Sequence, residues 1–417
     1  MQRILITVFF LFNFFSVIYS VDKTIKIYTW EDVLSEAKKH NPLIRSARES
    51  VNRSELNYKK SFSNFLPQFS FNLGKDIAGS EQSGKSENYS YGISGNISIF
   101  SGFSDINNLK LKEIELKTSE IEFRRIYSDV IYNLKKSFYN LLWAQEMVNL
   151  TKIILDKRIE NYELVKFKYE SGREDKGSLL RVEADKIQSE YEFNKAKRNL
   201  RTTYIKLIED IGLDNYDIIV VTGSFIVNKP EEISSFTELI RQIPEYIIAK
   251  NNLQKVDYEI KIAESEFYPK ISFSGSTSKF GDKWLPENSR WSIGLGLSYP
   301  FYSGGRNVYD LKIAKVDRII AEQNLKEIEK QILSKIIAAY NSYIDAVENV
   351  FVREKYLEAS EEQSKIRTVK YINGLISYQD WYITENDFIN SQTALLNMKR
   401  DAIDAEAYWK NILGLGE

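Results

Sequence analysis

Side chains that could perform covalent or metal chemistry are scarce in this chain. It has one histidine, His40, and no cysteine. A Ser-His-Asp or Cys-His nucleophile, and a zinc site built from several His or Cys residues, therefore lack the residues that they need. The sequence predicts no catalytic residue, no metal ligand and no cofactor-binding residue.

Carboxylates are plentiful, and paired carboxylates can hydrolyse glycosidic bonds. Asp and Glu number 58 in the 417 residues, against 57 Lys and Arg. They are interleaved with the bases along helical patterns, where solvation of an exposed face explains them. A carboxylate hydrolase is therefore disfavoured. The formal net charge of −1 gives no reason to expect nucleic acid as a partner.

The most regular feature of the sequence is a set of landmarks that recurs at a constant offset (244 − 42 = 202 residues). The landmarks are mostly proline and glycine, which fix where helices and strands begin and end. The repeat therefore predicts one architecture used twice. The matched landmarks are Pro42 and Pro244, Pro67 and Pro269, Ser101-Gly102 and Ser303-Gly304, Gly172 and Gly374, and Gly212 and Gly414.

Residues 1–20 read as a secretory signal peptide. Arg3 supplies the positive charge, Ile4 to Val17 is an apolar run, and Ser20 is a small residue at the cleavage site. The alternative is a membrane anchor, but the run is short for a bilayer span, which needs about 20 residues. An exported chain without cysteine has no disulfides, so packing or oligomerisation must stabilise it.

Each repeat is expected to contain a short helix, two strands, a long helix and a returning helix. The long helices contain no Gly and no Pro. The first repeat, 21–213, has the helix at 43–65, strands at about 68–75 and 89–100, the long helix at 103–171 and the returning helix at 175–212. The second, 243–417, has them at 245–267, about 270–277 and 290–301, 306–373 and 377–413. Between them, 214–242 is a linker with a small strand at 217–222 and a short helix at 231–242.

The strands alternate between apolar residues and Ser, Gly or Asn, so each has one apolar and one polar face. Their length suits a tilted β-strand crossing a bilayer, which takes about 9–11 residues. Exposed backbone cannot lie in lipid, so such a sheet must close, and single-chain barrels have about eight strands or more. Four strands per chain therefore require oligomerisation. The alternative is two hairpins of a soluble β-sandwich.

The long helices carry narrow apolar stripes with charged residues on both flanks. This pattern suits a helix that packs sideways against two neighbours with water on its other sides, as in the wall of a hollow tube. An ordinary antiparallel coiled coil would explain the stripes alone. The predicted fold class is therefore an α+β membrane protein, with a duplicated repeat that contributes four strands to a barrel and long antiparallel helical hairpins to a tunnel.

The chain resembles the TolC family of outer membrane efflux proteins over essentially its whole mature length. The resemblance rests on the duplicated order of elements, the Pro before each first strand, the Phe/Tyr-Ser-Gly after each second strand and the Gly at each helical turn. It implies a homotrimer in the cell outer membrane, with a twelve-stranded transmembrane β-barrel above a periplasmic α-barrel. It also implies a periplasmic adaptor and an inner-membrane pump or ABC exporter as partners, and outer-membrane lipid around the barrel.

The resemblance also implies where function resides. In similar proteins the periplasmic tips, here Gly172 and Gly374, close the tunnel and contact the adaptor. A Tyr and an Asp tether the closed tip there, and the matching residues are Tyr371 and Asp380. The first repeat has Tyr169, but Ser178 in place of the Asp, so Tyr371 and Ser178 form an expected uncharged tether. The alternative for Asp380 is a helix N-cap or first-turn acid. The barrel junction is marked by Pro67, Ser101, Gly102, Pro269, Ser303 and Gly304.

Several questions stay open at this level. Similar proteins often carry an acidic ring nine residues after the second Gly, where this chain has Ile383, with Glu385 two residues on. The expected function is a passive exit duct of a tripartite efflux or type I secretion system, and the alternative is a secreted or surface-associated coiled-coil adhesin or scaffold. The cargo is undetermined. Aromatic residues near the strand ends form either an interfacial belt or ordinary junction packing; they are Phe100, Trp291, Tyr299, Phe301 and Tyr302.

Overall fold

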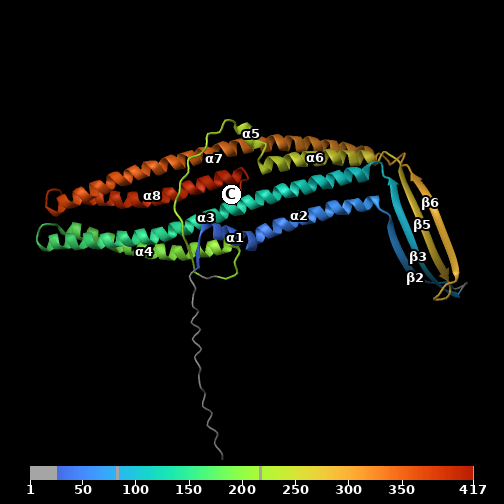
Figure 1. Cartoon of the computed structure of the whole chain (residues 1–417), viewed down its shortest axis with the longest axis horizontal. Helices are drawn as coiled ribbons and strands as arrows, with labels where there is room; N and C mark the ends of the chain where they lie inside the picture. The colour runs from blue at the N-terminus through green and yellow to red at the C-terminus, as the bar shows by residue number, and fades with distance from the viewer. Residues whose placement is uncertain (1–25, 81–83, 216–217, 417) are drawn as a thin grey trace, which may run out of the picture.

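The computed structural model describes residues 26–80, 84–215 and 218–416 (Figure 1). The signal peptide expected at 1–20 lies outside the described residues. Four strands form a sheet at one end of an elongated molecule, and long helices run from it to the other end.

Two long helices define the length of the molecule. α3 (Ser104–Glu170) and α7 (Arg306–Ile372) each have 67 residues. At ~1.5 Å per residue each is about 100 Å long. Each turns back into a shorter partner, α4 (Lys176–Ile211) or α8 (Tyr378–Ile412), to make an antiparallel hairpin. The observed bounds lie within one residue of those expected from the sequence.

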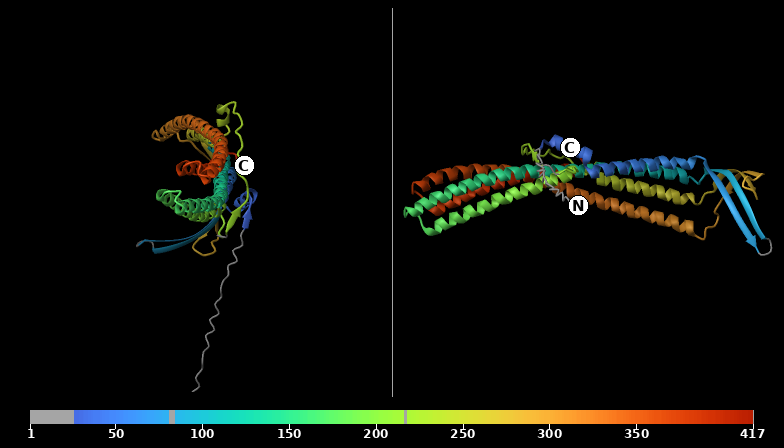
Figure 2. Two further views of the ribbon diagram at one scale, coloured as in Figure 1. Left: turned by 90° about the vertical axis from the view of Figure 1, so that its left-hand side faces the viewer. Right: turned by 90° about the horizontal axis from the view of Figure 1, so that it is seen from below.

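Shorter helices flank the other half of each long helix. α2 (Pro42–Ser61) packs against α3, and α6 (Pro244–Ser265) packs against both α3 and α7. Both begin with proline at the first turn, where the missing amide costs nothing. The helix expected at 43–65 ends earlier, because its last turn tightens into the 3₁₀ helix η1 (Phe62–Phe65). Viewed along the molecule, the helices form a curved wall (Figure 2).

The sheet is antiparallel, in the order β2-β3-β5-β6. Its strands are β2 (Gln68–Ser80), β3 (Gly84–Phe100), β5 (Lys270–Gly281) and β6 (Asn288–Ser298). Three of them are longer than the sequence indicated, and β6 ends at Ser298 rather than near 301. Much of the two expected polar loops is strand, because main-chain pairing continues past the apolar alternation, as at Ile77 and Glu87.

The register gives the sheet two different faces. One face, called here the apolar face, carries Phe71, Ile93, Phe273 and Leu295 in paired positions. The opposite face, called here the serine face, carries Ser, Asn and Gly along most of its length. Hydroxyl pairs cross neighbouring strands on the serine face, with oxygen–oxygen distances of 2.7 Å for Ser70 and Ser94 and 2.9 Å for Ser276 and Ser292.

Small elements wrap the helices at mid-length. β1 (Lys26–Tyr28) pairs in parallel with β4 (Ile219–Val221), and α1 (Trp30–His40) lies beside them. α5 (Phe236–Ile240) packs against α7 instead. β4 and α5 fall inside the segments expected at 217–222 and 231–242. β1 and α1 were not anticipated from the sequence.

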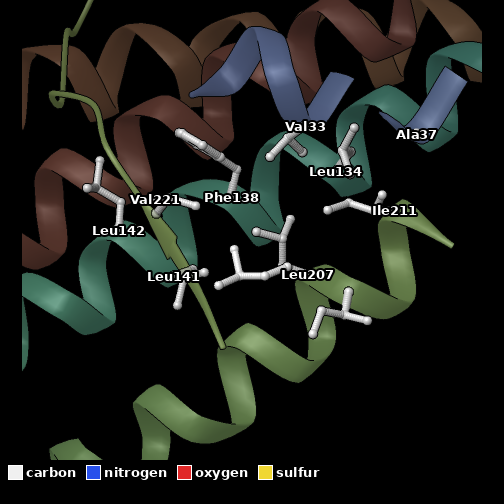
Figure 3. Packing of buried hydrophobic residues seen from close by; sticks show 11 residues of the cluster. Val33, Ala37, Leu134, Phe138, Leu141, Leu142, Leu207, Ile211 and Val221 are labelled. Atoms are coloured by element: carbon white, nitrogen blue, oxygen red, sulfur yellow. The ribbon is translucent and has the colours of Figure 1, made fainter. Parts of the chain in front are cut away.

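The main hydrophobic core lies at this mid-length belt (Figure 3). Val33 and Ala37 of α1 pack on Leu134 and Phe138 of α3, with Leu207 of α4 completing the contact. A second cluster gathers residues of α5, α7 and α8, among them Ile240, Ile336 and Trp409. The belt therefore holds each long helix near its middle and each returning helix near its end.

The helices of the described residues are amphipathic rather than uniformly apolar. None of them has a stretch that is both long and apolar enough to cross a membrane.

Candidate functional site

The candidate site is the end of the molecule farthest from the sheet, where both hairpins turn (Figure 1). Gly172 and Gly374 have φ angles of +71° and +72°, which glycine adopts without strain. In both turns the glycine amide bonds back to a tyrosine carbonyl, at 2.9 Å for Gly172 to Tyr169 and 3.1 Å for Gly374 to Tyr371. This closes each long helix with a Schellman-type cap.

The returning helices begin with the same two side-chain types in exchanged positions. In α4, Asp175 is the N-cap and accepts from the Ser178 amide at 2.8 Å and from its hydroxyl at 3.2 Å. In α8, Ser377 is the N-cap, accepts from the Asp380 amide at 3.1 Å and donates to its carboxylate at 2.7 Å. Asp380 is thus the first-turn acid that the sequence left as an alternative, and Ser377 is the N-cap.

Tyr371 lies at the centre of the second tip and is 2% exposed. Its ring stacks on Trp381, with ring centroids 4.6 Å apart and planes 8° from parallel. The Lys168 ammonium of α3 lies 4.2 Å from the centroid of the same ring and donates to the Tyr371 carbonyl at 2.6 Å. The first hairpin therefore grips the last turn of α7 through a cation–π contact and a hydrogen bond.

The Tyr371 hydroxyl also bonds to the first hairpin. It donates to the Glu174 carboxylate at 2.8 Å, in the turn between α3 and α4. Burial, and secondarily this bond to Glu174, raise the pKa of Tyr371 well above its usual value, so it remains a donor at any physiological pH. The partner expected from the sequence was Ser178. Within this chain the Ser178 hydroxyl bonds to Asp175 instead, since both belong to one capping turn.

A buried carboxylate lies one turn further along α8. Glu385 is 1% exposed and accepts from three neutral donors: Ser364 and Thr368 (3.0 Å) of α7 and Asn161 (3.4 Å) of α3. Thr368 in turn accepts from the Trp381 indole nitrogen at 3.1 Å. Glu385 therefore joins three helices, and its carboxylate lies inside the bundle. At the position where similar proteins carry an acidic ring, Ile383 is 49% exposed.

Two arginines of the first hairpin complete the contact. Arg181 of α4 donates to the Tyr382 hydroxyl at 2.7 Å, and Arg158 of α3 donates to the Asn386 side chain. The hairpins are thus joined at the tip by hydrogen bonds that each have one charged partner, and by cation–π contacts. In this arrangement Ser and Thr hydroxyls donate hydrogen bonds to carboxylates of the helix caps or of the bundle interior. The contacts at the tip can hold the two hairpins together, and their release would let the hairpins separate.

The residues expected at the barrel junction lie where the helices meet the sheet. The turn at Gly102 and Phe103 has φ angles of +67° and +70°, and the turn at Gly304 and Gly305 has +66° and +87°. Gly102 also meets α6 closely, because an added Cβ would lie 2.5 Å from the Ser265 carbonyl oxygen. Ser101 and Ser303 accept from the amides of Asp105 (3.2 Å) and Asn307 (3.4 Å).

The prolines and aromatic residues expected at the junction lie near the ends of the strands. Pro67 and Pro269 precede β2 and β5. Phe100 packs edge-on against Phe103, with ring centroids 5.1 Å apart, whereas Tyr299, Phe301 and Tyr302 are exposed. Across the described part of the chain, no group of three or more His, Cys, Asp or Glu side chains could hold a metal ion.

The chain is similar to known proteins along most of its length. The family model described as "Outer membrane efflux protein" matches residues 33–213 and 247–415, well over half of the chain. The chain belongs to this family. The resemblance noted in the sequence is thereby confirmed, and this efflux protein is an outer membrane channel whose helical part extends into the periplasm. The same finding favours the channel over the adhesin.

Individual relatives of this efflux protein are distant in sequence but extensive in coverage. Outer membrane efflux protein BepC of Brucella suis biovar 1 is 19% identical, over 93% of this chain and 85% of the relative. Outer membrane protein TolC of Vibrio cholerae is 22% identical, over 87% and 86%. The structure of the open state of the Neisseria gonorrhoeae MtrE outer membrane channel superposes with a TM-score of 0.82 at 18% identity, over 93% and 89%.

Glu174, Lys168 and Trp381 of the tip network were not predicted from the sequence, and Glu385 was noted only beside the acidic-ring position, not as a buried residue. A signal for two of them existed. Trp381 and Glu385 are four residues apart and share a helix face, so a tryptophan on that face indicated that the carboxylate was buried with it. No comparable signal marks Lys168 or Glu174, which lie among many similar charged residues.

Proposed function

We propose that this protein is the homotrimeric exit duct of a tripartite efflux or type I secretion system. The observation that carries the proposal is the sheet, with one apolar face, one serine face and two unpaired edge strands, β2 and β6. Backbone polar groups at an open edge cannot remain unpaired in lipid. Pairing β6 of one copy with β2 of the next would close the barrel, and three copies would supply twelve strands (3 × 4).

The same closure would form a tunnel from the helices. The curved wall of each chain would supply one third of a periplasmic α-barrel in register with the strands above it (Figure 2). The serine face would line most of the membrane pore with small uncharged groups, with charged residues only toward the strand ends, such as Asp76 and Arg290, which suits passive conduction of varied solutes. A duct of this kind performs no catalytic step.

The tip is the proposed docking surface for a periplasmic adaptor, which would link the duct to an inner-membrane pump or ABC exporter. Apolar side chains are exposed there despite the surrounding water: Phe167 is 67% exposed and Leu375 is 72% exposed. Exposed apolar residues gathered at one end of a protein are typical of an interaction site.

In-cell photo-crosslinking tests this proposal. A photoreactive residue at Leu375 should capture an adaptor, identified by mass spectrometry. Leu285, equally exposed at 72% but in the loop between β5 and β6, is the matched control and should not capture one. Capture of no periplasmic protein from Leu375, with normal insertion in the outer membrane, would sink the assignment of the tip as the docking surface.

We further propose that Tyr371 helps to hold the tip closed. Tyr371→Phe keeps the stacked ring and removes only the bond to Glu174, which contributes about 1–2 kcal/mol because one partner is charged. Single-channel conductance in planar bilayers, or antibiotic leakage, should increase, and Glu174→Gln should act in the same direction. Unchanged conductance in both variants would mean that this bond is not a tether.

A further inference from the structure

The outer end of the apolar face carries positive charge. Lys75 of β2 pairs in register with Tyr89, and Lys279 of β5 pairs with Tyr91. Both lysines therefore lie on the same face as Leu73 and Ile93. Both lie two to four residues farther from the helices than Ile93. Lys85 of β3 lies on this face as well, nearer the hairpin turn.

The charges on this face do not cancel. Glu87 lies 3.0 Å from the Lys75 ammonium and 2.8 Å from that of Lys85, so one carboxylate serves two lysines. It is the one acidic residue on this face among the described positions of the four strands. Lys279 has no ion-pair partner within the described residues. This end of the apolar face therefore carries three cations and one anion, beyond the rows of paired apolar side chains.

Aromatic residues mark this level as an interface. Tyr89, Tyr91 and Trp291 lie on the apolar face just below or beside the lysines. The loop after β5 folds Trp284 onto Tyr89, with ring centroids 5.7 Å apart. Tyr and Trp gather where a membrane protein passes from hydrocarbon to headgroups, and lysines there extend into the headgroup layer.

Below the lysines the apolar face is hollowed. Gly95 and Gly275 are register partners, and at this point neither strand has a side chain. The result is a groove of about 420 Å³, lined by Phe69, Ile93, Phe273, Thr277 and Trp291 among others. Gly275 forms its open floor, because a Cβ added there would meet nothing nearer than the Ser292 carbonyl oxygen at 3.8 Å. Along β5 the groove lies four residues, about 13 Å, below Lys279.

We propose that this face binds a phosphorylated lipid of the outer leaflet. One acyl chain would lie in the groove over Gly275, and the headgroup phosphate would be bound between Lys279 and the Lys75–Lys85 pair. The inference rests on the proposed barrel, which places the strand ends far from the helices at the outer surface. The groove lies at the depth of a lipid acyl chain, and the lysines lie at the depth of its headgroup phosphate. An anionic lipid would occupy both, whereas a soluble anion would leave the groove unfilled.

Native mass spectrometry of the full-length protein in detergent tests the proposal. Delipidated protein would be titrated with lipid A, a phosphorylated glycolipid, with phosphatidylcholine as the neutral comparator. The wild type should retain lipid A in preference. A Lys75→Gln and Lys279→Gln double variant should bind it less tightly, by about fivefold for each lysine removed. Inorganic phosphate alone should not displace the lipid.

The chain offers a matched control and an independent variant. Arg290 lies on the serine face at a similar height, so Arg290→Gln removes a cation without touching the proposed site. It should leave lipid A retention unchanged. Gly275→Leu should fill the groove and abolish selective retention while the trimer mass and the conductance persist.

The outcomes separate this inference from the channel proposal. If a trimer forms and conducts, but the lysine variant retains lipid A as the wild type does, or Arg290→Gln weakens retention equally, the lipid site is wrong and the channel stands. Absence of any trimer in the wild-type spectrum would overturn the proposed barrel, and the lipid site with it.

Discussion

The two hairpin tips share one backbone but differ in how their side chains are used. Both long helices end in a glycine with φ near +70°, and both returning helices begin with an Asp and Ser capping pair. Tyr169 in the first tip is 37% exposed, whereas Tyr371 in the second is 2% exposed. The backbone landmarks therefore set the shape of a tip, and a few side chains decide which tip is held by its neighbour.

The difference extends along the returning helix. At the offset of 202 residues (381 − 179), the partly buried Leu179 corresponds to Trp381, which is 1% exposed. Glu183 is exposed, while its counterpart Glu385 is 1% exposed. The first hairpin supplies the charged donors and acceptors, and the second supplies the aromatic and buried surface that they contact.

The largest expected contrast is between the two tyrosines. Tyr371→Ala removes a buried ring stacked on Trp381, so the free energy of local opening at the tip should fall by about 3–5 kcal/mol. Tyr169→Ala should change it by less than about 1 kcal/mol, because that ring is partly solvated. Hydrogen exchange of peptides from the two tips measures both changes. Equal changes in Tyr371→Ala and Tyr169→Ala would show that the two tyrosines do not differ in how they stabilise their tips.

Glu385 and Glu183 give the next contrast. Glu385→Ala leaves Ser364, Thr368 and Asn161 without their shared acceptor, which should cost about 1–3 kcal/mol. Glu183→Ala removes a solvated carboxylate and should be nearly neutral. Denaturant unfolding followed by helical circular dichroism would compare the two variants. A neutral Glu385→Ala would show that the buried carboxylate contributes nothing to holding the helices together.

The two glycines should behave alike, since the backbone is the shared feature. At Gly172 and Gly374 an added Cβ would meet no atom within 4 Å, so only the positive φ opposes alanine. Each Gly→Ala change should cost about 1–2 kcal/mol. Limited proteolysis at the two turns would report this as matched increases in cleavage rate. Strongly unequal increases would mean that the turns are not equivalent.

The smallest expected difference between the two tips is the response of their helix N-caps to acid. The backbone bond from Ser178 holds the pKa of Asp175 below its usual 3.8. A lowered folded-state pKa means that the cap contributes stability above the unfolded pKa and loses it as pH falls through the folded value. The start of α4 should therefore loosen below about pH 4, while the hydroxyl of Ser377 still caps α8.

A substitution isolates this pH effect. Asp175→Asn keeps a side-chain acceptor at the N-cap but cannot ionise in this range. Exchange of the first turn of α4, corrected for the intrinsic pH dependence of exchange, should then no longer vary with acid. A persistent pH dependence in Asp175→Asn would assign the effect to another group.

Much of this architecture was predictable because proline and glycine act locally. The ends of α3 and α7 follow from Gly172 and Gly374, and the two faces of the sheet follow from period-two alternation. Strand length was underestimated because polar residues near Lys75 and Glu87 give no alternation, yet the neighbouring strand still pairs with them. The pairing of β3 with β5 joins segments far apart in sequence, which local patterns do not encode.

The tip network was less predictable, for a physical reason. The partner of Tyr371 depends on how two hairpins face each other, and several polar residues near the first turn could have met it. Ser178 was the partner favoured by analogy, but its hydroxyl is used within its own helix cap, where Asp175 lies three residues away. Glu174, two residues beyond Gly172, is the one that faces Tyr371.

The length of α3 has a mechanical consequence. The core that grips α3 at Phe138 lies 32 residues from its end at Glu170 (170 − 138). That distance is about 48 Å at ~1.5 Å per residue, so each hairpin is a lever with its fulcrum at the belt. A tilt of about 2° would displace the tip by about 1.7 Å, enough to stretch the 2.8 Å bond between Tyr371 and Glu174 beyond hydrogen-bonding range. A slight rotation at the middle of the molecule is therefore sufficient to break the contact at its end.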